Sequence, residues 1–487
     1  MPRFTTVSPL ASSLLAIAVA GCAIGPDYQA PSVALPDTFR NAAAARARTA
    51  AAAPALAAWW RGFDDAQLDR VIAQVTAQNL DLAQATARVA HSRAAAQAAG
   101  AALLPRGEVQ ASTARVSQSL REPTALIARD SPAFERSFTL DGLDAAASWE
   151  IDLFGGVRRE REAARAEFDA AVANGDAIRM SLMAEAADAY LQLRGEQRRL
   201  AVARQQERIG EQLAGLVAQR VHEGLSAERE LHQAQAALEG VRASMPALEA
   251  GIEAQLERLR VLAGDLPDTA HDALAAAAPL PAVPALPEGE APSELLRRRP
   301  DVVAAERRVA AANARIGAAL SEYYPQVSIA ALLGVSSVGA SRLFSDDAAQ
   351  HQIGLGLRWR LFDFGRVDAE VAAARGRDAE ALAAYRAVVL RASAEVETAL
   401  SDLVQQEARA SALTRQIGQL RQAREQSGQA YDGGAISLIE VLDADRQLLA
   451  ASDQLSVAQA GAARAAVACF RAMGGGWEPA TATLASR

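Results

Sequence analysis

Two carboxylates near the C-terminal end of the chain are spaced so that they could act together. Glu440 and Asp443 lie three residues apart, which puts both side chains on one face of a helix. Crowded carboxylates attract cations, oppose anions and raise the pKa of some of the carboxyl groups. The stretch Ser437-Leu438-Ile439-Glu440 also has the spacing of a capping box, which stabilises a helix N-terminus. The residues alone leave both roles open.

No other group of residues in the sequence has the pattern of a catalytic or metal site. The HExxH, CxxC, P-loop, GxGxxG and GxSxG motifs, in a matching context, are all missing, and the histidines are isolated. The net charge is −8 and all 50 cationic residues are arginines scattered along the chain, a balance that argues against a nucleic-acid partner. We therefore expect neither an enzyme, nor a metal site, nor a cofactor. His222 and His232 are interpreted as solvated side chains.

The N-terminus reads as an export signal with a lipid-attachment site. Leu10 to Ala20 is apolar but too short to span a bilayer, and it leads into Val19-Ala20-Gly21-Cys22, which resembles a bacterial lipobox. We expect a signal peptide over residues 1–21 and a covalent lipid on Cys22. The alternative is an ordinary signal peptide followed by an incidental thiol. If Cys22 is acylated, Cys469 has no partner and is expected to be a small buried hydrophobic residue.

The chain contains an internal duplication. Residues 79–105 match residues 299–325 with a shift of 220, and the segment ending at Val157 matches the segment ending at Val367 with a shift of 210. We therefore predict a lipidated N-terminal and equatorial segment at 22–78, followed by a first repeat at 79–265. A proline-rich linker and equatorial region at 266–298 leads to a second repeat at 299–473 and a C-terminal tail at 474–487.

Each repeat contains two segments with strand periodicity. From Leu143 to Leu153 the odd positions are apolar and most of the even positions are polar, and the same alternation returns between Ile353 and Leu361. Shorter versions lie at Val109–Ser119 and Val327–Leu333. Alternation over about ten residues is typical of a transmembrane barrel strand. An amphipathic hairpin in a soluble protein is the local alternative.

Long helical segments follow the strands in both repeats. Residues 157–220 and 367–430 carry apolar side chains at helical spacing and contain no proline. A helix of this length extends for roughly 100 Å and needs packing partners along its face. After Cys22 the sequence has no run of 18 uncharged apolar residues, so we expect membrane passage to depend on the strands.

Four strands cannot close a barrel, and hydrocarbon does not tolerate an open sheet edge. Cyclic association of identical chains removes the edges, giving eight strands from two chains or twelve from three. We favour three, because only the wider barrel leaves an open lumen. The predicted fold class is an α+β membrane protein with internal duplication: a trimeric 12-stranded β-barrel, four strands per chain, that continues into a long α-helical barrel.

Several stretches resemble one known family. They are GCAIGPDYQAP from Gly21, the Trp59-Trp60 pair, RRRPDVVAAERRVAAANARIGAALSEYYPQVSI from Arg297, and YDGGAISLIEVLDADRQLL from Tyr431. Together they are similar to the outer-membrane factor family of TolC-like efflux channels, and most similar to its OprM/NodT lipoprotein branch. The resemblance implies a homotrimer in the outer membrane that extends into the periplasm, where it works with a periplasmic adaptor protein and an inner-membrane transporter, commonly of the RND type.

The resemblance also implies a function for the helix ends. Glu440 and Asp443 match the acidic ring of a periplasmic gate, while Tyr431 and Glu230 match a latch that holds the gate closed. Ile436 stands where the family has an arginine of a second latch, which puts that latch in doubt. The turns at Gly224-Leu225 and Gly434-Ala435 match the tips where the adaptor docks. Tyr431 could equally be a core aromatic residue, and the glycines could serve only to form tight turns.

The implied function is a passive exit duct for small molecules such as drugs. Two alternatives remain: the outer-membrane duct of a type I protein-secretion system, and a periplasmic adaptor lipoprotein. An adaptor has a single helical hairpin and no barrel strands, so the duplication and the four alternating segments count against it.

Overall fold

The computed structural model describes residues 23–34, 36–48, 53–132, 134–265, 272–287, 294 and 297–478. Cys22 and the predicted signal peptide lie outside these residues. The chain divides into two compact units: residues 1–31, 90–170 and 306–384 form the first, and residues 32–89, 171–305 and 385–487 form the second. Both units combine segments from both sequence repeats, so the compact units do not follow the repeat boundaries.

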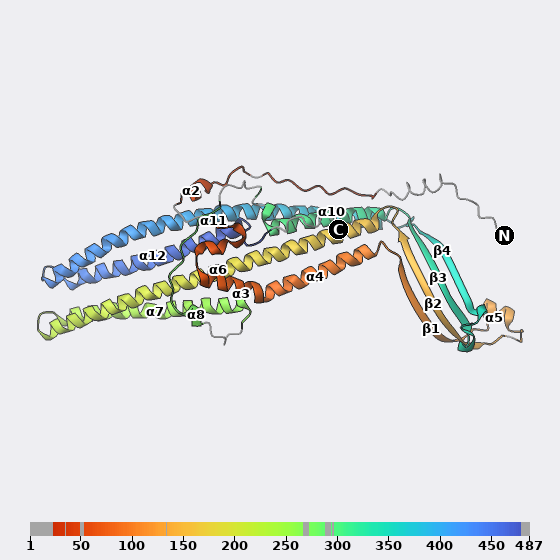
Figure 1. Cartoon of the computed structure of the whole chain (residues 1–487), viewed down its shortest axis with the longest axis horizontal. Coiled ribbons are helices and arrows are strands. Elements are labelled where there is room, and N and C mark those ends of the chain that lie inside the picture. The colour runs from red at the N-terminus through yellow and green to blue at the C-terminus, as the bar shows by residue number, and fades with distance from the viewer. Residues whose placement is uncertain are drawn as a thin grey trace. The chain divides into compact units, whose positions relative to one another are not determined.

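The first unit contains one four-stranded antiparallel sheet (Figure 1). Its strands follow one another in chain order: β1 (Arg106–Ser117), β2 (Ser137–Ile151), β3 (Gln326–Val338) and β4 (Ala349–Arg358). A short helix, α5 (Pro123–Ala128), lies between β1 and β2, and two 3₁₀ turns, η2 (Ala340–Arg342) and η3 (Asp346–Ala348), lie between β3 and β4. All four predicted strand segments are therefore confirmed as strands.

The register of the sheet gathers the apolar positions on one face. Ala145 lies between Val109 of β1 and Leu333 of β3, and Ala331 lies between Ala147 of β2 and Ile353 of β4. Because side chains alternate across a strand, every other residue of each strand contributes to this face. The opposite face carries mostly polar or small residues such as Glu108 and Asp144, together with a few apolar ones such as Leu140 and Leu332. Val109, Leu333 and Ile353 are 75%, 69% and 80% exposed in the single chain.

β4 ends three residues earlier than the alternation suggests. We expected a strand to Leu361, but the last pair of the β3–β4 ladder is Gln326 with Arg358. The next partner would be Pro325, which has no N–H to donate. β2 meets the same obstacle at Pro105, yet it continues to Ile151 because β3 pairs with its other edge. β4 has no second neighbour among the described residues, so its ladder stops.

Besides α5, four described helices contribute residues to the first unit. They are α4 (Leu80–Ala101), α6 (Gly156–His222), α10 (Pro300–Ser321) and α11 (Arg366–Asp432). Ala166 of α6 packs against Ala310 and Ala311 of α10. The two long helices match their predicted ranges within two residues at each end. They begin after Gly155 and Gly365, which share a φ of 81°.

The second unit is helical. Besides residues of α4, α6, α10 and α11, it contains η1, α2, α3, α7, α8 and α12. Their bounds are Leu56–Phe63, Ala42–Arg46, Ala66–Gln78, Glu228–Ala263, Asp272–Ala275 and Leu438–Ala472. The core forms around Trp59, which is fully buried and stacks on Phe470 at 5.4 Å between ring centroids. None of the helices within the described ranges is long and apolar enough to cross a membrane.

Candidate functional site

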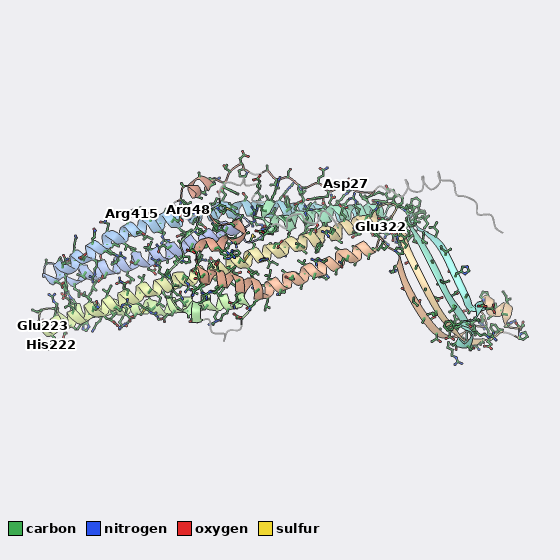
Figure 2. All side chains as sticks on the ribbon, in the orientation of Figure 1. Asp27, Arg48, His222, Glu223, Glu322 and Arg415 are labelled. Atoms are coloured by element: carbon green, nitrogen blue, oxygen red, sulfur yellow. The ribbon has the colours of Figure 1, made fainter. Side chains whose placement is uncertain are left out.

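The candidate site lies in the second unit, where two helical hairpins end. α6 turns into α7, and α11 turns into α12, as Figure 1 shows. Figure 2 labels His222 and Glu223 at the first of these turns. The structure brings residues of all four helices together here, in a small hydrophobic group that we call the tip cluster. It consists of Val217, Ala234, Tyr431, Leu438 and Val441.

The two turns have the same backbone geometry. Gly224 and Gly434 have φ values of 71° and 72°, which L side chains rarely adopt. In the first turn Gly224 N–H donates to Val221 O and Leu225 N–H donates to Arg220 O. In the second turn Gly434 and Ala435 donate in the same way to Tyr431 and Ala430. Both are Schellman turns, in which a left-handed residue satisfies the last carbonyls of the helix.

The turns present exposed residues at their outer ends. Leu225 is 65% exposed, and Gly224, Gly434 and Ala435 are also exposed. Apart from the glycine and its two chain neighbours, no described residue has an atom within 4 Å of the position that a Cβ would take at Gly224 or Gly434. The glycines are therefore required by backbone conformation and not by crowding.

Tyr431 is buried in the tip cluster, only 5% exposed. The Arg220 guanidinium lies over its ring, 4.8 Å from the centroid, in a cation–π contact. The Tyr431 hydroxyl has no hydrogen-bond partner among the described residues, and Glu230 is half-buried on α7. The structure thus pairs Tyr431 with Arg220 and does not bring it into hydrogen-bond contact with Glu230. We had not anticipated Arg220, although its position at the last turn of α6 was a usable signal.

Glu440 and Asp443 lie on the first two turns of α12. Glu440 is exposed and its side chain makes no hydrogen bond to the residues described. Asp443 accepts hydrogen bonds from Arg446 Nη2 at 2.5 Å and Gln447 Nε2 at 2.6 Å. Arg446 and then Gln447 hold the pKa of Asp443 below its ordinary value. The two predicted carboxylates therefore differ, since one is compensated and the other is not.

The capping box predicted at Ser437 forms only in part. Ser437 occupies the N-cap position of α12, but its side chain makes no capping hydrogen bond. The Glu440 N–H donates to Ser437 O instead, at 3.1 Å. Capping bonds between side chain and backbone therefore do not explain why an acid stands at position 440.

A groove runs beside these carboxylates, between α12 and the α6–α7 hairpin. Asp443, Asp445 and Arg446 line it from α12. Asp445 is also paired with Arg424 of α11 at 3.0 Å. The remaining lining is mostly apolar and includes Ile209, Leu213, Ala237, Leu238, Ile439 and Leu442.

The other residues considered from sequence form no site. Cys469 is buried, as predicted, and burial raises the pKa of its thiol to about 12. His222 and His232 are exposed. Within the part of the chain that the structure describes, no group of histidine, cysteine, aspartate and glutamate side chains could hold a metal ion.

Known proteins are similar to this chain in sequence and in fold. The family described as "Outer membrane efflux protein" matches residues 71–265 and 291–475. The chain is 32% identical to the pyoverdine export outer membrane protein OpmQ of Pseudomonas putida over 478 residues, which is 98% of each chain. It is 26% identical to nodulation protein T of Rhizobium leguminosarum bv. viciae, covering 92% of this chain and 89% of the relative. The structure of the outer-membrane channel OprN superposes with a TM-score of 0.84 at 33% identity, covering 94% of this chain and all of that one.

Proposed function

This chain belongs to the outer membrane efflux protein family and is the outer-membrane channel component of an efflux pump, and we propose that it acts as a homotrimeric, lipid-anchored, passive exit duct. The observation that carries the proposal is the sheet, which has an apolar face four strands wide and two unpaired edges. The apolar positions from Leu143 to Ile151 extend for about 26 Å along β2. That length suits the apolar band of an outer-membrane barrel.

Closure of the sheet requires further copies of the chain. Within the described part of the chain, β1 and β4 each have a row of unpaired backbone groups along one edge, which hydrocarbon does not tolerate. Three copies related by a cyclic axis supply twelve strands, enough for an open lumen. We further propose a periplasmic adaptor protein and an inner-membrane transporter of the RND type as the partners of this trimer.

The contacts of the segment after Cys22 support lipid anchoring at that residue. The Ile24 N–H donates to Phe154 O at 3.1 Å, and a side chain at Gly155 would collide with Ala23. Arg159 holds the same segment through Ile24 O and through Asp27, at 2.9 Å. A lipid on Cys22 would therefore start one residue before Ala23, which lies beside the turn between β2 and α6. The mature protein is expected to release palmitate on hydrolysis, and a Cys22→Ser variant is expected to release none.

We propose that the helix tips form the periplasmic gate. In a trimer, Glu440 and Asp443 would supply six carboxylates around the axis, and Tyr431 and Glu230 of neighbouring tips would form the latch. Replacing Glu440 and Asp443 together with alanine should raise single-channel conductance in planar bilayers and weaken cation selectivity. Glu228→Ala, an exposed acid on the first hairpin, is the matched control. Unchanged currents in the double variant would refute the gate.

We propose that the adaptor docks at the exposed turn residues Gly224, Leu225, Gly434 and Ala435. A deletion strain that expresses the Leu225→Arg variant should no longer export a small-molecule drug, while the conductance of the purified variant channel should stay the same. Loss of conductance would instead place Leu225 in the pore. Small-molecule cargo is favoured over protein secretion because a relative similar over its whole length is named for pyoverdine export.

A further inference from the structure

The internal duplication extends to the strand register. A shift of 220 carries β1 onto β3, and a shift of 210 carries β2 onto β4. Applied to the β1–β2 pair of Arg106 with Ser148, these shifts give Gln326 with Arg358, which is an observed pair of β3 and β4. The two hairpins therefore have identical registers and are equivalent units of one pattern.

The β2–β3 ladder joins the first repeat to the second, and the described residues contain no equivalent of it. The equivalent would run from β4, the last strand, to a copy of β1. The same shifts convert the observed pair Ala146–Leu332 into Gly356 with Ser112 of the partner subunit. We propose that β4 of one copy pairs antiparallel with β1 of the next in this register. The inference rests on the proposed trimer and specifies its subunit seam.

Between Leu357 and Arg360 the side chains at the proposed seam match one another on both faces of the sheet, whereas Ile353 comes opposite Arg115 of the partner subunit. On the apolar face, Trp359 comes opposite Val109 of the partner subunit, and Leu357 comes opposite Ala111 of the partner subunit. On the polar face, Arg360 comes opposite Glu108 of the partner subunit. A slip of one residue would move each apolar side chain to the polar face.

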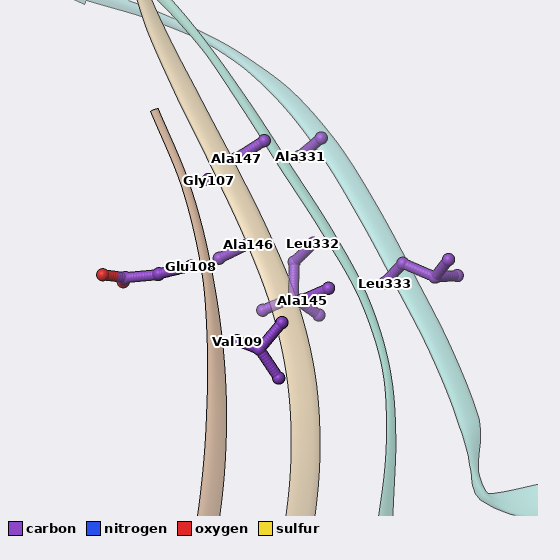
Figure 3. Close-up of a pocket in the computed structure, with 9 residues that line it drawn as sticks. All are labelled: Gly107, Glu108, Val109, Ala145, Ala146, Ala147, Ala331, Leu332 and Leu333. Atoms are coloured by element: carbon purple, nitrogen blue, oxygen red, sulfur yellow. The ribbon is translucent and has the colours of Figure 1, made fainter. Parts of the chain in front are cut away.

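Glu108 is placed to reach across the seam. Figure 3 shows its side chain extending from the free edge of β1, away from Ala146 and Leu332 of the neighbouring strands. It is exposed and makes no ion pair with the residues described. Arg360 is partly exposed, and its guanidinium is shared between Glu322 at 2.9 Å and Glu370 at 3.3 Å. Charges of opposite sign thus lie at matching positions on the two open edges.

The seam also accounts for the early end of β4. Trp359, Arg360 and Leu361 have no strand partners among the residues that the structure describes, because Pro325 stops the β3–β4 ladder. In the proposed register, Leu361 meets Gly107 of the partner subunit, just as Ile151 meets Val327 within the chain. Pairing with a second copy would therefore extend β4 to Leu361, the strand end that the sequence alternation predicts.

A second contact between the repeats points to the same partner. The Phe154 ring stacks on Tyr324 with 4.7 Å between centroids. The repeat equivalents of these residues are Phe364 and Leu104, which are 99% and 66% exposed in the single chain. Phe364 also has a left-handed φ of 53°, an unusual conformation for a phenylalanine. The pattern places Phe364 against Leu104 of the partner subunit.

Paired cysteines test the register directly. Gly356→Cys combined with Ser112→Cys is expected to give disulfide-linked trimers on non-reducing gels after mild oxidation, because directly opposed residues have Cα atoms about 5 Å apart. The matched control combines Gly354→Cys with Ser112→Cys, which offsets the pair by two residues and should cross-link at least about tenfold less. The single variants measure any background from Cys22, and Cys469 is buried.

Each result has a defined meaning. Dominant cross-linking of the offset pair would overturn the register. Failure of both pairs in a protein that migrates as a trimer on native gels would overturn the β4–β1 seam and leave the trimer intact. A monomer on native gels would overturn the trimer together with the seam.

The aromatic contact has its own readout. Phe364→Ala is expected to lower the temperature at which the native trimer dissociates. Phe364→Leu should dissociate at nearly the native temperature. Phe362→Ala is the control, because Phe362 is 89% exposed but its repeat equivalent is Asp152, a polar residue that accepts hydrogen bonds from the N–H groups of Val157 and Arg158 at the start of α6. Equal effects of the alanine variants at 362 and 364 would contradict the proposed contact.

Discussion

The two hairpin tips have nearly the same backbone but different chemistry. Both turns have a left-handed glycine and the same pair of backbone hydrogen bonds. The shift of 210 places Glu230 on Glu440, so each tip has an acid at this position. It also places Gln233 on Asp443 and Ala236 on Arg446. The acid–base pair thus occurs in the second tip and both of its members are missing from the first.

The two tips therefore share the backbone geometry of the duplicated unit, whereas several side chains at equivalent positions differ in size, burial and charge. Leu438 is fully buried in the tip cluster, whereas its equivalent Glu228 is exposed. Tyr431 is buried, and its equivalent Val221 is only partly buried. The second hairpin therefore contributes most of the buried cluster and also the compensated carboxylate.

The largest expected effect is the loss of Leu438. Leu438→Ala removes a fully buried side chain and should cost about 2 to 5 kcal/mol in the free energy of opening the tip. Amide hydrogen exchange at the start of α12 measures this opening. Glu228→Ala is the equivalent change in the first tip and should alter exchange by less than about 0.5 kcal/mol. Similar effects at the two positions would show that the tips are equally packed.

Substitution of a turn glycine should have the next largest effect, and the two substitutions should have the same free-energy cost. Gly224→Ala and Gly434→Ala each force a Cβ into a left-handed conformation without a clash, at an expected cost of about 1 to 2 kcal/mol. Hydrogen exchange of the adjacent helix ends gives both values. A cost that differed widely between the turns would contradict the equivalence of their backbones.

Arg446 should change the selectivity of the pore by a smaller amount. Because Arg446 donates to Asp443, Arg446→Gln should uncover that carboxylate and raise the cation-to-anion permeability ratio about twofold in planar bilayers. Arg446→Lys keeps the charge and should resemble the native channel. If Asp443→Asn alters selectivity and Arg446→Gln does not, the ion pair has no role in conduction.

Low pH should remove the contribution of Asp443 to the ion selectivity of the channel. The pKa of Asp443 is lowered from its ordinary 3.8 by Arg446 and Gln447, so the contact is fully present above that value and is lost as the pH falls through the lowered one. The Asp443-dependent part of the selectivity should therefore disappear below pH 3.8, and Arg446→Gln should shift its midpoint upward. A midpoint well above 3.8 in the native channel would mean that crowding of carboxylates around the axis outweighs the Arg446 contact.

Much of this architecture could be predicted from the sequence, because periodicity reports which face of an element is buried. The long proline-free segments predicted α6 and α11 to within two residues of their ends, and the alternation in residues 143–153 predicted β2, although this strand begins six residues earlier, at Ser137. The end of β4 was wrong because Pro325 interrupts a ladder between distant segments, an effect that the β4 residues do not reveal. The family of the chain followed from extended motifs such as the one that begins at Arg297.

The contacts at the tips were harder to predict because they depend on packing between helices far apart in sequence. Tyr431 meets Arg220 across two hairpins, and no local pattern distinguishes that contact from one with Glu230. The pairing of Asp443 with Arg446, by contrast, is a local contact, because residues three apart on one helix lie on the same face.

The smallest expected effect belongs to the Tyr431 hydroxyl. It makes no hydrogen bond among the described residues, while the ring is buried and contacts Arg220. Tyr431→Phe keeps the ring, so the free energy of opening the tip of one chain should change by less than about 0.5 kcal/mol. It removes the hydroxyl of the proposed latch to Glu230 of a neighbouring tip, so conductance should rise slightly. Tyr431→Ala is the contrasting variant and should open the tip, because it removes the ring itself. Unchanged conductance with Tyr431→Phe and with Glu230→Gln would show that the hydroxyl does not latch the closed gate to an acid of the first hairpin.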